Sequence, residues 1–126
     1  METVKRALDE VGRQLAEADK NGREYWTFVQ TENYLTKMLL IEERIATAER
    51  DLISAKGIRM NACEQLLKLG RSSSEDDYVK DGILATKHSI ETSVEMTVDL
   101  RTKLELLRTE KDNLVTKRVM ERSTQH

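Results

Sequence analysis

The stretch KLGRSSSEDD, residues 68–77, separates two long segments that have helical periodicity. Gly70 follows Lys-Leu, so we expect it to end the first helix in the left-handed conformation that glycine adopts without steric cost. Each serine of residues 72–74 has an acidic residue three positions later, which provides a capping partner for a second helix. The stretch therefore predicts a corner at residues 70–74. Phosphorylation of the serine cluster is a rival interpretation of the same residues.

On both sides of this corner, apolar residues recur at alternating steps of three and four, the heptad pattern of helices that pack against other helices. A second helix over about residues 75–122 would not be stable by propensity alone, so its faces need partners. The first stripe comprises Met38, Ile41, Ile45, Ala48, Leu52, Ala55, Arg59, Ala62, Leu66 and Leu69. The second comprises Ile83, Thr86, Ile90, Ser93, Thr97, Leu100, Leu104, Leu107, Lys111, Leu114 and Arg118. The valines expected to widen the second stripe are Val79, Val94, Val98, Val115 and Val119.

Together the two stripes predict an all-α protein dominated by a long antiparallel helical hairpin, a coiled coil over residues 24–126. A tight corner at residues 70–74 also sets the register between the two helices. In this register large residues meet large residues far from the corner, and alanines of the first helix lie opposite residues of the second nearer to it. The expected facing pairs are Met38 with Leu107, Ala48 with Thr97, and Ala55 with Ile90.

Residues 1–23 form a separate N-terminal segment that the spacing predicts to be an amphipathic helix. The dipeptide Asn21-Gly22 is a turn signal, so this helix can fold back and complete a three-helix bundle. The same phase also continues to Tyr25 and Val29, so a straight helix can project and enter an intermolecular helical bundle. Projection is slightly favoured, because the corner signals at residues 19–23 are weaker than those at 70–77. The apolar stripe of this segment comprises Val4, Leu8, Val11, Leu15 and Ala18.

Four aromatic residues lie within ten positions at the end of the hairpin opposite the corner: Tyr25, Trp26, Phe28 and Tyr34. A single heptad seam cannot bury all of them. They indicate either a thicker, three-helix core or a docking surface, since clustered Trp and Tyr dominate the energetics of interfaces. The candidate protein-binding residues are Val4, Leu8, Val11, Leu15, Tyr25, Trp26 and Phe28.

The sequence contains little that indicates catalysis. Cys63 is the single cysteine, which excludes an intrachain disulfide and a cysteine-rich metal site, and we interpret it as inert, in the core or at its edge. His88 lies three residues before Glu91, a spacing typical of a surface pair. Neither a glycine-rich phosphate loop nor a Glu-x-x-His pair of the di-iron type occurs. We expect no enzymatic activity, no cofactor and no metal site.

Charge and hydropathy restrict the partners. The formal net charge is −2, and the basic residues near the C-terminus, Lys111, Lys117, Arg118 and Arg122, alternate with acidic ones, which argues against nucleic-acid binding. No apolar run approaches the roughly 18–20 residues of a membrane-spanning helix. The first residues do not have the pattern of a signal peptide. These features argue against a membrane partner and predict a cytoplasmic, reducing location.

The function expected from this architecture is that of a non-catalytic coiled-coil scaffold or adaptor, a small subunit of a larger homo- or hetero-oligomeric assembly. Such a protein acts by burying its apolar stripes in a shared helical bundle. The alternative is a small helical chaperone or escort that transiently shields an amphipathic segment of a client protein. A stable stoichiometric complex favours the scaffold, whereas release during client assembly favours the escort.

Overall fold

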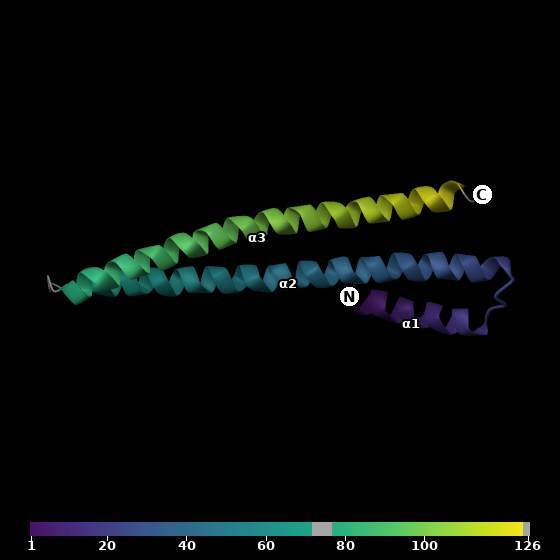
Figure 1. Ribbon diagram of the computed structural model, residues 1–126, viewed down its shortest axis with the longest axis horizontal. Helices are drawn as coiled ribbons and strands as arrows, with labels where there is room; N and C mark the ends of the chain where they lie inside the picture. Colours follow the sequence, from purple (N-terminus) through teal and green to yellow (C-terminus); the bar gives the residue numbers. More distant parts are fainter. Residues whose placement is uncertain (72–76, 125–126) are drawn as a thin grey trace. The chain divides into compact units, whose positions relative to one another are not determined.

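The computed structural model describes residues 1–71 and 77–124, and this part of the chain contains three α-helices and no strand. They are α1 (Glu2–Glu17), α2 (Arg23–Arg71) and α3 (Asp77–Thr124), shown in Figure 1. The predicted all-α class is therefore confirmed. The predicted cap at residues 72–74 lies outside the described residues. The chain divides into two compact units: unit 1 comprises Met1–Ala46 and Leu106–His126, and unit 2 comprises Thr47–Glu105.

The two long helices contain no proline, and each presents its predicted stripe to the interior. Every member of both stripes is buried or half-buried, which confirms the heptad pattern. The charged members Arg59, Lys111 and Arg118 are half-buried, since long side chains bury their stems and keep their charged ends in water. The expected widening of the second stripe is wrong at four of the five valines. Those exposed are Val94, Val98, Val115 and Val119.

Unit 2 has a seam of small residues. Ala48 and Ala55 of α2 are completely buried, and Ser93 and Thr97 of α3 are 1% and 3% exposed. The buried hydroxyls donate to carbonyls of their own helix, Ser93 to Ile90 and Thr97 to Ser93, each at 2.8 Å. These bonds satisfy the polar groups that burial removes from water. Small side chains with satisfied hydroxyls allow α2 and α3 to pack closely in this unit.

The predicted cap and register require correction. Helix α2 continues through Gly70 to Arg71, and no described glycine has a positive φ angle, so Gly70 is not a left-handed cap. In unit 2, a Cβ atom added to Gly82 would lie 3.5 Å from Cδ1 of Leu69, whereas the predicted register placed residue 75 or 76 there. The α3 residues thus lie several positions further along than predicted. The reason is that α2 runs past Gly70 to Arg71, so the first helix is longer than predicted.

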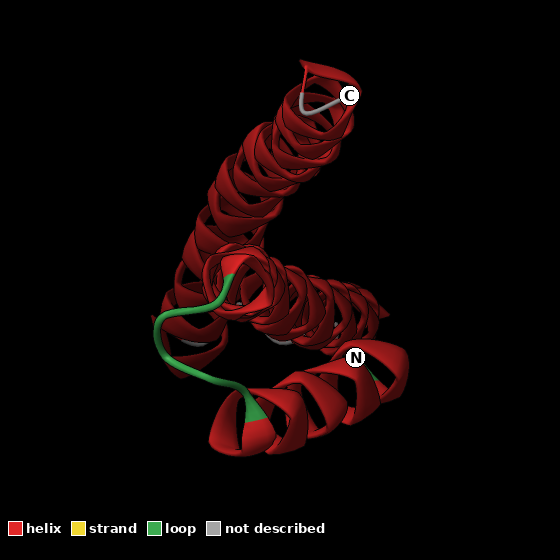
Figure 2. Ribbon diagram, turned by 90° about the vertical axis from the view of Figure 1, so that its right-hand side faces the viewer, coloured by secondary structure: helices red, strands yellow, loops and turns green. Residues whose placement is uncertain are grey.

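In unit 1, α1 folds back beside α2 (Figures 1 and 2). Asp19 organises the reversal: its carboxylate Oδ1 accepts a hydrogen bond from the backbone N–H of Asn21 at 3.1 Å, and its carbonyl accepts one from Gly22 at 2.9 Å. This is the local geometry by which Asp closes turns. The slight preference for a projecting helix is wrong, and the fold-back alternative is correct.

Candidate functional site

The predicted protein-binding residues lie in unit 1 with different exposures. On α1, Val11 is buried, and Val4, Leu8 and Leu15 are half-buried, so much of their surface is already covered within the chain. The aromatic residues are at the start of α2, where Tyr25 and Phe28 are half-buried. Trp26 is 64% exposed, and its ring meets that of Tyr25 edge to face with centroids 6.0 Å apart. Trp26 is therefore the predicted residue with the most surface left for a partner.

Glu42 of α2 is a junction that no sequence pattern indicated. One carboxylate oxygen lies 3.1 Å from the α-ammonium group of Met1, and the other lies 3.4 Å from Nζ of Lys111 on α3. The side chain is 17% exposed. Burial alone would raise the pKa of Glu42, but the hydrogen bonds and charges of the two cations outweigh it and hold the pKa below its ordinary value. Glu42 therefore links all three helices within unit 1.

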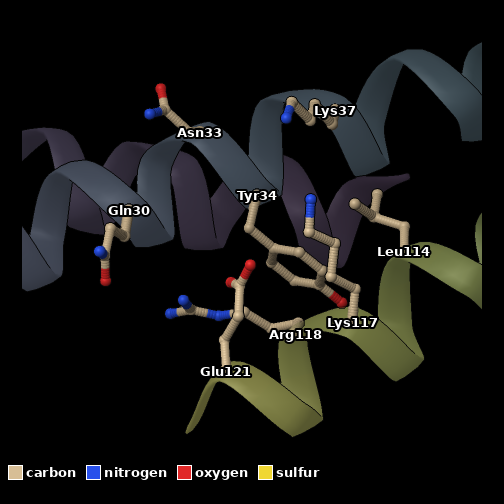
Figure 3. A pocket seen from close by; sticks show the side chains of 8 residues that line it. All are labelled: Gln30, Asn33, Tyr34, Lys37, Leu114, Lys117, Arg118 and Glu121. Carbon is tan, nitrogen blue, oxygen red and sulfur yellow. The ribbon is translucent and has the colours of Figure 1, made fainter. Parts of the chain in front are cut away.

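A groove runs between α2 and α3 in unit 1, and we call it the α2–α3 groove. It consists of two adjoining cavities of about 380 and 300 Å³, which share Lys37, Leu114 and Lys117. All of its lining residues come from α2 and α3. The first cavity (Figure 3) also has Gln30, Asn33, Tyr34, Arg118 and Glu121, and the second has Leu40, Ile41, Arg44, Glu110 and Asn113.

At one end of the groove, Tyr34 reaches from α2 toward α3, as Figure 3 shows. The guanidinium carbon of Arg118 lies 5.6 Å from the centroid of the Tyr34 ring, within range of a cation–π interaction. Arg118 also donates a hydrogen bond of 2.8 Å to Oγ1 of Thr31. In the predicted register Thr31 would have faced residue 113 or 114, so this contact corrects the register in unit 1 as well. These contacts join the two helices beside the cavity.

Large apolar side chains flank the groove on both helices. Asn33 and Asn113 line it, and residues seven positions before or after them lie on the same side of their helices. On α2 these are Trp26 and Leu40, which are 64% and 48% exposed. On α3 they are Leu106 and Met120, which are 67% and 64% exposed.

The charge of the groove is predominantly positive. Its cations are Lys37, Arg44, Lys117 and Arg118, and its acidic residues are Glu110 and Glu121. The floor is apolar, since Ile41 is 5% exposed and Leu114 is half-buried. The site thus combines an apolar floor, exposed apolar flanks and a cationic rim. This arrangement suits helix packing. The groove itself was not predicted from the sequence, and none of the predicted binding residues lines it.

Other candidate chemistry is dispersed. Cys63 and His88 are both exposed, which places Cys63 outside the core. Across residues 1–71 and 77–124, no three His, Cys, Asp or Glu side chains gather as a metal ion would require. In the same part of the chain, no helix has the length and apolar character needed to cross a membrane. No protein-family model, curated protein or solved structure matches the chain.

Proposed function

We propose that this chain is a non-catalytic helical scaffold or adaptor, which joins other protein chains in the cytoplasm by helix packing. The observation that carries the proposal is the α2–α3 groove of unit 1 with its four exposed apolar neighbours. Covering a large apolar side chain with a partner would gain roughly 25 cal/mol of free energy per Å² of apolar surface removed from water. Clustered exposure of this kind is typical of protein–protein interaction sites. The four side chains are Trp26, Leu40, Leu106 and Met120.

Unit 2 supports the same proposal independently. Ile53, Met60 and Leu67 of α2 follow one another at intervals of seven residues, so they share one side of the helix. All three are more than 60% exposed. A two-helix unit that already buries its own seam therefore also has a large apolar stripe available for a further helix. The cytoplasmic part of the proposal is supported by the single cysteine, since one thiol cannot form an intrachain disulfide.

Site-directed photo-crosslinking in the native cells tests this function. A benzophenone amino acid replaces Met120 beside the groove. In the control it replaces Arg122, which is also exposed but points in a direction about 160° away on the same helix. We expect a stable crosslinked partner from position 120 and not from position 122, and a co-purified complex with a mass above 14.5 kDa. Leu40→Glu combined with Leu106→Glu should remove the crosslink. A helical monomer that gives no crosslink from position 120 would contradict the proposal.

A further inference from the structure

We infer that the α2–α3 groove binds one amphipathic helix of a partner protein, and that acidic residues flank the apolar stripe of that helix. The inference rests on the proposed function and specifies the class of partner. Three features of the groove carry it: its length, the positions of its apolar side chains and the sign of its charge.

The length and walls of the groove fit a helix. Its lining residues on α2 extend from Gln30 to Arg44. At 1.5 Å per residue this distance is about 21 Å, which corresponds to about four helical turns of a partner. A helix satisfies its own backbone hydrogen bonds, whereas an extended segment laid between two helices would leave its N–H and C=O groups unpaired. A helix is therefore the occupant that this groove can bury at the lowest cost.

The apolar side chains are placed to enclose such a helix from both sides. Trp26 and Leu40 flank the groove on α2, and Leu106 and Met120 flank it on α3. The floor between them is formed in part by Ile41 and Leu114. A partner helix with an apolar stripe would contact the floor and cover these exposed side chains. Unit 1 would then contain four packed helices in place of three.

The charges of the groove favour particular residues beside the apolar stripe of the partner helix. Along the α2 side, the residues at intervals of seven are Arg23, Gln30, Lys37 and Arg44, and none of them is acidic. Lys117 adds a cation from α3, where Glu110 is the acidic residue at the equivalent position one heptad earlier. Acidic residues beside the partner's apolar stripe would lie close to these cations.

A second copy of the chain is a poorer occupant of the same groove. In a two-fold symmetric contact the same predominantly cationic patch meets itself, so the cations Lys37, Arg44 and Lys117 of one copy would lie close to those of the other. Like charges brought together at an interface oppose association. The charge of the groove therefore favours a different protein with an acidic helix.

Two synthetic peptides of 18 residues test the inference. They share one leucine stripe and lack tryptophan, and the positions flanking the stripe are Glu in one peptide and Lys in the other. Trp26 is the single tryptophan of the chain and lies one heptad before the lining residue Asn33, on the same side of α2, so its emission is the signal used for occupancy. We expect the Glu peptide to shift the Trp26 emission to shorter wavelength and to bind at least about tenfold more tightly than the Lys peptide. Added salt should reduce this difference.

Charge reversal provides the matched variant. Lys37→Glu combined with Lys117→Glu should invert the preference between the two peptides, with the helix content checked by circular dichroism. Equal binding of both peptides that is lost in Leu40→Glu would overturn the acidic partner and leave the proposed function intact. Absence of binding, or binding that Leu40→Glu does not weaken, would show that the groove is not the docking site. The proposed function is tested separately, by the crosslink from position 120. The wild-type protein could also form a dimer. If Leu40→Glu dissociates that dimer and the Glu peptide does not dissociate it, the occupant of the groove is a second copy of the chain.

Discussion

Glu42 shows how one side chain can order three helices. Its carboxylate forms ion pairs with two cations that are far apart in the sequence, the Met1 ammonium and Lys111. Both N···O distances are below 3.5 Å. Glu43, the next residue, is exposed and faces away from this junction. Because successive residues of a helix differ by about 100° in direction, two adjacent glutamates have different environments. The difference makes them a matched pair for substitution.

Glu42→Gln should lower the free energy of unfolding by about 1–2 kcal/mol at pH 7, because the two charge-assisted contacts are lost. The folded-state pKa of Glu42 is held below its ordinary value near 4.5, so its stabilisation is present above that pH and declines as the pH falls through the lowered pKa. Thermal unfolding at pH 7 and pH 3 measures both effects. Glu43→Gln is the control and should have little effect at either pH. An equal loss in the two variants would show that the junction does not stabilise unit 1.

Gly57 and Gly22 are expected to respond differently to substitution by alanine. Gly57 is exposed inside α2, and a Cβ atom added there meets no atom within 4 Å. Gly57→Ala should therefore stabilise the protein by about 1 kcal/mol, the difference in helix propensity. At Gly22 the added Cβ would lie 3.2 Å from the carbonyl oxygen of Asp19, which closes the turn. Urea unfolding should show no gain for Gly22→Ala, and a gain equal to that of Gly57→Ala would contradict the turn geometry.

At the scale of the elements, α1 depends on its packing. It has 16 residues, a length at which an isolated helix is marginal in water. Its apolar stripe, with Val11 buried, supplies the packing. The turn at residues 18–22 and the Glu42 ion pair hold its two ends. Loss of the stripe should therefore release α1 without unfolding α2 and α3.

Leu8→Glu combined with Leu15→Glu tests this dependence. The two charges would be placed where half-buried apolar side chains now pack, so we expect α1 to detach and its helical signal to be lost. Hydrogen exchange should become fast over residues 1–22 and stay slow at Ala48 and Ala55, which are completely buried. Thr3→Glu with Ala16→Glu adds the same charge at exposed positions and should leave α1 protected. Unchanged protection of α1 in the leucine variant would contradict the role of the stripe.

At the scale of the whole molecule, the two units have different cores. In unit 1 the buried residues of α2 are large, Met38 and Ile41, whereas in unit 2 they are Ala48, Ala55 and Ala62, although Leu104 of α3 is also buried there. Much apolar surface remains on the outside of both units. In this chain, some large apolar residues lie in its own core, and others lie on exposed surfaces that suit packing against other helices.

Ile53→Lys combined with Leu67→Lys should change the free energy of unfolding by less than about 0.5 kcal/mol, because both side chains are exposed in the chain itself. The same variant should bind less of a hydrophobic dye and associate less at high concentration. Circular dichroism melts with light scattering measure both properties. Ala55→Lys, at a completely buried position of the same helix, is the contrasting variant and should unfold unit 2. A loss of helix content in the first variant would mean that the stripe is buried.

The sequence by itself determined the helices and the faces they bury. The stripes from Met38 to Leu69 and from Ile83 to Arg118 are the buried faces of α2 and α3, because a heptad spacing places its members on one side of any helix. The same spacing places the apolar stripe of α1 on one side of that helix. It also identified Trp26 as a candidate contact, since an aromatic cluster exceeds what one seam can bury.

Only the tertiary structure decided how these faces are matched. The register differs from the predicted one because α2 continues through Gly70, and propensity alone places a helix end poorly. The junction at Glu42 depends on partners that are distant in the sequence, and the reversal at Asp19 depends on local turn geometry. The α2–α3 groove has the same origin: Lys37 and Lys117 come together only when the register is set. Periodicity defines the face of a helix, whereas the distances between faces are set by packing.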